Sequence, residues 1–183
     1  MPKRNNMNTN AEIIYFYVEH VATPIGEMIA VTDSQKRLRA LDWTDCEMRM
    51  HRLLRLHYAH SDIRLITETI PKDIKRLLDA YWQGDLTAIG DIPVKTGGTP
   101  FQQEVWSALR SIPAGKTMSY KMQAAEIGKP SAIRAVALAN GSNPIGIVIP
   151  CHRIIGSDGS LTGYAGGIKR KLRLLEHEGI YLK

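Results

Sequence analysis

The sequence predicts an α+β protein in which a small N-terminal domain of strands and helices precedes a mostly helical C-terminal domain. Short segments rich in Ile, Val, Tyr and Phe gather in residues 12–43, as is typical of strands. Beyond them, apolar residues recur at helical spacing. The stretch GDIPVKTGGTP, residues 90–100, has the composition of a linker. The chain of 183 residues is therefore expected to divide into domains 1–92 and 93–183.

The N-terminal domain is expected to begin with three strands, EIIYFYVEH, GEMIAVT and RLRALDW, with a turn at residues 23–26 between the first two. Two helices follow, at about residues 44–59 and 71–82, because Leu and Ile recur there three and four positions apart. The polar residues 1–10 are expected to be disordered.

Short helices are expected in the C-terminal domain. Thr99, Ser119 and Ser131 are each placed to cap one of them, and Pro100 follows the first cap. The second and third helices are separated by Gly128-Lys129-Pro130. This is the pattern of a helix-turn-helix, and it is also a corner that many small helical domains contain.

The third of these helices, SAIRAVALAN, is nearly all small or aliphatic, and Arg134 is its only charged residue. A helix that reads bases in the major groove needs Asn, Gln, Arg or Lys on its exposed face. If this helix binds DNA, we expect contacts mostly to phosphates, with little sequence preference. The alternative is a core helix with one exposed arginine.

Positive charge is concentrated in the C-terminal half. Residues 93–183 hold 12 Lys or Arg and 5 Asp or Glu, whereas residues 1–92 hold 12 and 13, in a chain of formal net charge +6. An anionic partner such as nucleic acid is therefore expected on the C-terminal domain, and a merely solubilising surface is the alternative.

The two cysteines, Cys46 and Cys151, lie far apart in the sequence. They make neither a disulfide framework nor the Cys-x-x-Cys pair of a zinc site, so we expect no bound metal. The polar start of the sequence predicts no signal peptide, and no apolar run reaches membrane-spanning length. The expected setting is reducing and cytoplasmic, without membrane contact.

The segment IVIPCHR, residues 147–153, sets a thiol beside an imidazole. Pro150 favours an extended residue before it, so the run GIVI is expected to be strand-like and to end at Cys151. An imidazole can take the thiol proton, directly or through water, and a carboxylate commonly holds its tautomer. Glu176 and Glu178 are both available for that purpose. An inert buried cysteine and a Cys–His hydrolase remain alternatives at this point.

Residues 140–179, NGSNPIGIVIPCHRIIGSDGSLTGYAGGIKRKLRLLEHEG, closely resemble the active-site region of the O6-alkylguanine-DNA alkyltransferases, or methylated-DNA–protein-cysteine methyltransferases. The resemblance extends back through GGTPFQQEVWSALRSIPAGKTMSY and RAVALANG and, more loosely, to ATPIGEM, so it covers most of the chain. The chain is most similar to bacterial members without a fused phosphotriester-repair module. The resemblance implies a ribonuclease-H-like N-terminal domain and a C-terminal domain with a helix-turn-helix.

The implied activity is direct reversal of DNA damage in a single turnover, without a cofactor. The resemblance implies that Cys151 accepts the alkyl group of O6-alkylguanine, that His152 deprotonates it through a water molecule, and that Glu178 orients His152. Arg134 is implied to enter the base stack from the minor groove and fill the gap left by the flipped guanine, with Ser131 and Ala135 beside it on the DNA surface. O4-alkylthymine as a substrate and cooperative assembly of monomers on DNA stay open.

The pocket is also implied by the resemblance. Tyr120 crowds the target phosphate and donates toward guanine N3, and Asn143 braces the turn before the active-site segment. The backbone of Tyr164 and Ala165 edges the pocket with an amide toward O6. The backbone carbonyls of Cys151 and Ile154 are implied to accept from the exocyclic amine of guanine. Lys171 is implied to support Tyr120 and the pocket.

Three departures from the family pattern stand out, namely Gln123, Ala137 and Ala165. A buried unpaired amide at Gln123 would be costly, because relatives usually have an aliphatic residue there. A rival from another class is a non-catalytic lesion sensor on the same fold. In such relatives the reactive cysteine is replaced, commonly by Trp, and the presence of Cys151 argues against that reading.

Overall fold

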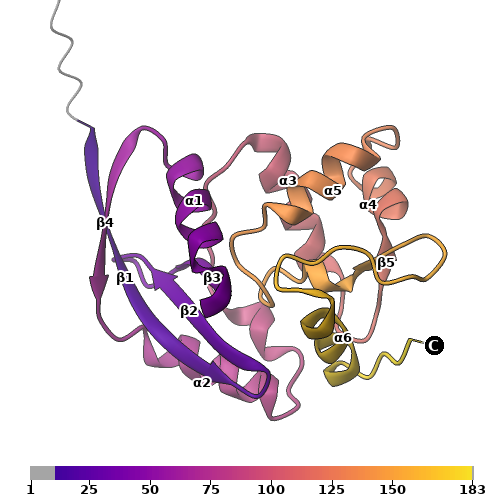
Figure 1. The fold of residues 1–183 in the computed structure, drawn as a ribbon, viewed down its shortest axis with the longest axis horizontal. Helices are drawn as coiled ribbons and strands as arrows, with labels where there is room; N and C mark the ends of the chain where they lie inside the picture. The colour runs from indigo at the N-terminus through magenta and orange to yellow at the C-terminus, as the bar shows by residue number, and fades with distance from the viewer. Residues whose placement is uncertain (1–10, 183) are drawn as a thin grey trace, which may run out of the picture.

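The computed structural model describes residues 11–182 as a mixed α/β molecule, and the expectation for residues 1–10 lies outside the described part (Figure 1). One four-stranded sheet has the order β3-β2-β1-β4. β1 is antiparallel to β2, β2 is antiparallel to β3, and β1 is parallel to β4. The four strands are β1 Glu12–Thr23, β2 Gly26–Thr32, β3 Leu38–Trp43 and β4 Ser61–Thr67.

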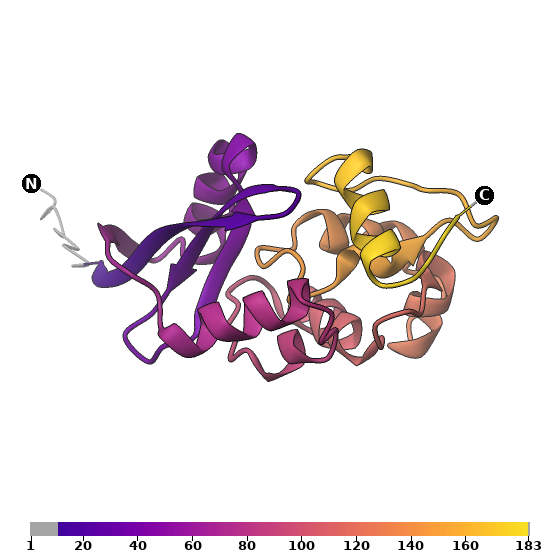
Figure 2. The ribbon, with the colours of Figure 1, turned by 90° about the horizontal axis from the view of Figure 1, so that it is seen from below.

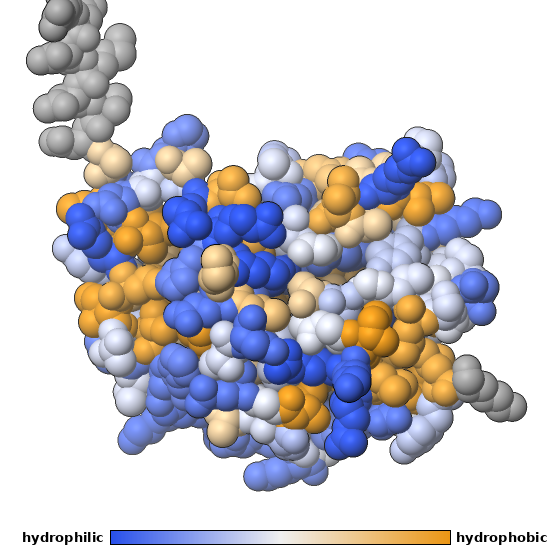
Figure 3. Space-filling model, in the orientation of Figure 1, coloured by the Kyte–Doolittle hydropathy of each residue, from blue (hydrophilic) through white to orange (hydrophobic). Residues whose placement is uncertain are grey.

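The three strands expected from the sequence are confirmed, and β4 is an addition to them. β4 is a short edge strand, largely exposed, in which polar and apolar residues alternate only over residues 62–65. Figure 3 shows an apolar area at its left, over the N-terminal sheet. Ile13 of β1 and Leu65 and Ile66 of β4 are exposed.

The helices of the N-terminal part lie against the sheet (Figures 1 and 2). The predicted helix at residues 44–59 is a 3-10 turn, η1 Thr44–Cys46, followed by α1 Glu47–His57. The predicted helix at residues 71–82 is α2 Lys72–Trp82, and η2 Ala88–Asp91 follows it. α1 buries Met50, Leu53 and Leu54.

The C-terminal part is built mainly from α3 Pro100–Ser111, α4 Tyr120–Glu126, α5 Ile133–Gly141 and α6 Ile168–His177. β5 Met118–Ser119 pairs with β6 Ile154–Ile155, and η3 Cys151–Arg153 precedes β6. The expected caps at Thr99 and Ser119 are confirmed, since the first forms a capping box with Gln102 and the second accepts from the amide of Met122.

Two expectations for the C-terminal part are wrong. Ser131 does not cap α5, because the helix begins two residues later, after Ala132, without a side-chain cap. The run GIVI before Pro150 is not strand-like but a series of turns in which Ile147 has a φ of 67°. The turns are held in part by backbone hydrogen bonds to Leu41, in a distant part of the chain.

One hydrophobic cluster runs through both parts of the chain. It joins Met28 and Trp43 from the sheet to Trp106 of α3 and Leu174 of α6. The division at residues 92 and 93 stays a prediction, and side chains from both sides of it pack into this one core. Within residues 11–182, no helix combines the length and the apolarity that crossing a bilayer requires.

Candidate active site

The turn that presents Cys151 is held by β3. The amide of Leu41 donates to the carbonyl of Pro144 at 2.9 Å, and the carbonyl of Leu41 accepts from the amide of Gly146 at 2.8 Å. The next residue, Ile147, has a positive φ, and such a conformation is costly for a β-branched residue. The chain then reaches Cys151, which is partly buried at the start of η3.

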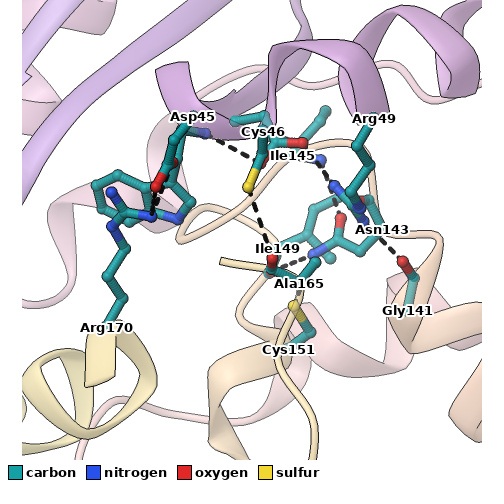
Figure 4. A network of polar contacts seen from close by, with 12 residues as sticks. Asp45, Cys46, Arg49, Gly141, Asn143, Ile145, Ile149, Cys151, Ala165 and Arg170 are labelled. Atoms are coloured by element: carbon teal, nitrogen blue, oxygen red, sulfur yellow. Dashed lines mark hydrogen bonds and ion pairs between the residues drawn. The ribbon is translucent and has the colours of Figure 1, made fainter. Parts of the chain in front are cut away.

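Asn143 contacts the thiol itself. Its Nδ2 donates to the carbonyl of Ile149 at 2.7 Å and to Cys151 Sγ at 3.2 Å, and its Oδ1 accepts from the amide of Ile145 at 3.0 Å. Asn143 is therefore bonded both to the turn and to the sulfur (Figure 4), and its role as a brace stays a prediction.

Burial raises the pKa of the Cys151 thiol above its ordinary value, while the Asn143 amide and the charges of Arg49 and Lys171 act in the opposite direction. The thiol is consequently a weak acid that needs a base to become a nucleophile. Within the described residues no hydrogen bond joins Sγ to the imidazole of His152. The thiol proton therefore has no direct hydrogen bond along which to pass to the imidazole.

His152 and Glu178 form a buried pair. His152 Nε2 lies 2.8 Å from Glu178 Oε1, and both side chains are fully buried. Burial lowers the pKa of His152, so the imidazole is neutral near pH 7 and donates its Nε2–H to the carboxylate. Nδ1 then carries the free lone pair, and it meets no partner among residues 11–182. This nitrogen is available to accept a proton.

Arg153 and Tyr81 complete the surroundings of Glu178, and sequence reasoning gave neither a role. Arg153 donates from Nε to Oε2 and from Nη2 to Oε1, both at 2.8 Å, and the Tyr81 hydroxyl donates to Oε1 at 2.9 Å. Although burial would raise the pKa of Glu178, the contacts from His152 and Arg153 hold it far below its usual range. The position of Arg153 directly after the Cys-His pair could have identified it from the sequence. Tyr81 lies 97 positions from Glu178, and no local pattern marks it.

A cavity of about 580 Å³ opens beside the thiol. It brings together four of the predicted site residues, Cys151, Tyr120, Tyr164 and Ala165. Burial raises the pKa of Tyr164, so its hydroxyl stays a donor and acceptor at all ordinary pH values. The full lining consists of Arg49, Tyr120, Ala137, Asn140, Gly141, Cys151, Thr162, Gly163, Tyr164 and Ala165.

The loop that walls this cavity, residues 162–167, rests on the N-terminal part of the chain (Figure 4). The Cys46 thiol lies 3.6 Å from the carbonyl of Ala165, and Arg170 pairs with both carboxylate oxygens of Asp45 at 2.9 and 3.0 Å. A Cβ at Gly166 would lie 2.3 Å from the Trp43 indole nitrogen. Only glycine permits this approach of the loop to the indole.

Lys171 is fully buried and links Thr162, at the start of the same loop, to Ile154 of β6. Its ammonium donates to the carbonyls of Ile154 and Thr162, the latter at 2.6 Å. Burial lowers the pKa of Lys171 to about 8. Lys171 is thus bonded to the loop that walls the cavity, and no hydrogen bond to Tyr120 is found in the described part of the chain. Its supporting role at Tyr120 and the pocket stays a prediction. Ile154 is completely buried with its carbonyl engaged by Lys171, so its contact with a base amine stays a prediction.

The predicted DNA-contacting residues lie on or beside α5. Arg134, Ser131 and Ala135 are all exposed and lie outside the cavity lining, while Ala137 and Gly141 of the same helix border it. α4 and α5 pack together across the turn at Gly128, which has a φ of 71°.

Gln123, the unexpected polar residue of α4, is completely buried and paired. Its Nε2 donates to the carbonyl of Val105 at 3.2 Å, and its Oε1 accepts from Asn140 Nδ2 at 2.7 Å. The amide therefore does not carry the cost of an unpaired polar group, and it ties α4 to α3 and α5. Among residues 11–182, no group of three His, Cys, Asp or Glu side chains is arranged to hold a metal ion.

Comparisons with known proteins agree on one family. Residues 100–180 match the family model described as 6-O-methylguanine DNA methyltransferase, DNA binding domain. A methylated-DNA–protein-cysteine methyltransferase of Salmonella typhimurium is 51% identical over 164 residues, 90% of this chain and 96% of that relative. One of Methanosarcina barkeri is 41% identical over 162 residues, 88% of this chain and 96% of that relative. The crystal structure of Mycobacterium tuberculosis OGT in complex with DNA has a TM-score of 0.70 at 37% identity, covering 90% of this chain and 92% of that one.

Proposed function

The chain belongs to the methylated-DNA–protein-cysteine methyltransferases, and on that premise we propose that it repairs DNA by moving the alkyl group of O6-alkylguanine onto Cys151. The observation that carries the proposal is the position of the Cys151 sulfur. It borders the cavity, touches the Asn143 amide, and is followed in sequence by His152, whose Nδ1 is buried without a hydrogen-bond partner among residues 11–182.

The reaction is a single displacement. His152 Nδ1 takes the thiol proton through a water molecule, and Glu178 and Arg153 keep the imidazole in the tautomer that leaves Nδ1 free. The thiolate attacks the alkyl carbon, the C–S bond forms, and the C–O6 bond breaks. Guanine leaves as an anion that donors at the cavity wall stabilise until it gains a proton. Tyr120 and the amide of Ala165 are our candidates for those donors.

The product is a thioether with no bond that water readily cleaves, so each molecule reacts once. The added alkyl group has to fit a packed wall, and overpacking of this kind typically costs about 1–3 kcal/mol of stability. The alkylated protein is therefore expected to unfold more easily than the free thiol form.

Access to O6 requires the base to leave the duplex stack. We propose that α4 and α5 act as a helix-turn-helix that approaches the minor groove, with Arg134 in the gap left by the flipped guanine. The exposed position of Arg134 on the helix that borders the cavity supports this assignment. The small residues around it suit close approach to the DNA backbone without base-specific contacts. Ser131 and Ala135 are the neighbouring contacts that we propose.

The N-terminal sheet order and strand directions support the ribonuclease-H-like assignment for residues 1–92, which we propose on the strength of the resemblance. A monomer acting in the cytoplasm is the setting that we propose.

The variant Cys151→Ala tests the proposed function. We expect it to lose alkyl transfer completely and to bind a duplex containing O6-methylguanine as tightly as the wild-type protein, because the sulfur is not part of the DNA-contacting surface. Transfer that persists in Cys151→Ala would refute the assignment of the nucleophile. Loss of duplex binding in a folded Cys151→Ala protein would argue against the separation of binding from chemistry.

A further inference from the structure

Arg49 of α1 reaches from the N-terminal part of the chain to the segment that leads into Cys151 (Figure 4). Its Nη2 donates to the carbonyl of Gly141 at 2.7 Å and to the carbonyl of Asn143 at 3.0 Å. Its Nη1 pairs with Asp42 Oδ2 at 2.6 Å, and Asp42 Oδ1 accepts from the amide of Trp43. Because Asp42 is buried and held by its own backbone contact, it fixes the direction of the guanidinium.

The first acceptor, Gly141, is the last residue of α5. The final carbonyls of a helix have no partner within it, and a cation is favourable there because the helix C-terminus carries partial negative charge. Arg49 therefore caps the helix that bears Arg134. Its second acceptor belongs to Asn143, the residue whose amide touches the Cys151 sulfur.

The segment that Arg49 holds is strained. Ile147 keeps a φ of 67°, and a residue persists in such a conformation only where its surroundings determine it from several directions. The two backbone hydrogen bonds from Leu41 fix residues 144–146, and Arg49 fixes residues 141 and 143. Both restraints come from the N-terminal part of the chain, although the thiol belongs to the C-terminal part.

Arg49 also borders the cavity that holds Cys151, so its positive charge acts on the sulfur. The other charged or titratable groups around the sulfur are Lys171 from α6, which favours the thiolate, and Asp42 from β3, which opposes it. Tyr164 of the cavity loop and the adjacent imidazole of His152 complete the set.

We propose that Arg49 is a positioning residue for alkyl transfer, which keeps the Asn143 amide on the Cys151 sulfur and favours the thiolate through its charge. The proposal rests on the roles of Cys151 and Asn143 in the proposed function. It also gives the N-terminal part of the chain a share in the chemistry, because removal of Arg49 would free the end of α5 and the Asn143 backbone together.

The test measures the thiol without DNA or alkylguanine. Alkylation of Cys151 by iodoacetamide is followed against pH and located by peptide mass mapping, which separates it from Cys46. We expect Arg49→Met to raise the pH midpoint by about one unit, the lower end of the usual effect of a nearby opposite charge. Arg49→Lys should restore most of that shift, since it keeps the charge. Arg55→Met, which removes an exposed charge from the same helix, should leave the midpoint unchanged.

A double-mutant cycle then tests whether Arg49 acts through Asn143. If it does, Arg49→Lys slows alkylation at pH 7 in the wild-type background and has little further effect beside Asn143→Ala. The proposal would be overturned if the double variant slowed alkylation by the product of the two single-variant factors. It would also be overturned if folded Arg49→Met had the same pH midpoint as Arg55→Met. If Arg49→Met does not fold, Arg49→Gln takes its place in the same comparison.

The two proposals fail separately in these experiments. A midpoint shift in Arg49→Met together with no transfer from an O6-methylguanine duplex to the wild-type protein would remove the proposed function and show that Arg49 acts on the Cys151 thiol alone. Normal transfer by the wild-type protein together with no midpoint shift in Arg49→Met would overturn the role of Arg49 and leave the proposed function standing.

Discussion

The hydroxyl of Tyr81 donates a hydrogen bond of 2.9 Å to Glu178 Oε1, the same oxygen that accepts from His152 and Arg153. Tyr81 is completely buried, and burial followed by the negative charge of Glu178 raises the pKa of its hydroxyl, so the group remains a donor. α2 therefore contributes directly to the pair that sets the base, across 97 positions of sequence.

Replacing Tyr81 by Phe should change both stability and pH dependence. The loss of a buried hydrogen bond to a charged group is expected to cost about 1–3 kcal/mol. Without the hydroxyl donor, Glu178 Oε1 interacts more strongly with His152, which should raise the pKa of the imidazole. The acidic limb of the rate profile should therefore move to higher pH. Single-turnover transfer measured from pH 5 to 8 checks this. Trp82→Phe, which alters the neighbouring ring without touching the carboxylate, should leave the limb in place.

Glu178→Gln should remove a pH-dependent part of the stability. The pKa of Glu178 is held far below the ordinary value of 4.5 in the folded state, so its contribution is present above pH 4.5 and is lost as the pH falls toward the folded pKa. At pH 7 the variant should be less stable by about 3–5 kcal/mol, because Arg153 is left buried without its partner. Urea unfolding at pH 7 and pH 4 measures both values. An equal deficit at the two pH values would contradict the linkage.

Arg134→Ala should lower repair in duplex DNA and spare the reaction with a free alkylated base. The side chain is exposed on α5 and lies outside the cavity, so the chemistry beside Cys151 should continue without it. The loss in the duplex should be on the order of a few kcal/mol, which is the usual cost of unstacking one base. Parallel single-turnover assays with duplex and with O6-benzylguanine make the comparison. Equal losses on both substrates would remove the role of Arg134 in base flipping.

Gln123→Leu should destabilise the fold by about 1–3 kcal/mol, since it leaves Asn140 Nδ2 buried without its partner. Exchanging Asn140 for Leu as well removes the orphaned donor, so the double variant should recover part of the loss. Chemical denaturation of the two single variants and the double variant gives the coupling energy. Simple additivity would mean that the pair contributes nothing as a pair.

The sequence predicted those elements whose signals are local. The strands β1, β2 and β3 have short apolar patterns, and the caps at Thr99 and Ser119 are set by single residues beside their helices. β4 was missed because its alternation of polar and apolar residues is only four residues long, residues 62–65, and its last four residues are exposed. The turns before Pro150 were mistaken for a strand because their conformation depends on backbone hydrogen bonds to Leu41, more than a hundred positions earlier.

The candidate site divides in the same way. Cys151, His152 and Glu178 could be predicted from the motif and its resemblance to a family, and Tyr120, Tyr164 and Ala165 meet at one cavity as expected from it. Arg49 and Tyr81 could not be found, because each acts on a residue about a hundred positions away and no local pattern marks such a contact. Both come from helices whose apolar faces predicted only core packing.

The central claim is that Cys151 takes the alkyl group itself and is consumed. The most direct measurement is intact-protein mass spectrometry after mixing the protein with excess duplex that carries one O6-methylguanine, followed by peptide mapping. The account predicts a gain of one methylene, located on the peptide of Cys151, that stops at one per protein molecule. An unmodified protein that binds the lesion tightly, or one that converts many lesions while its mass stays unchanged, would contradict it.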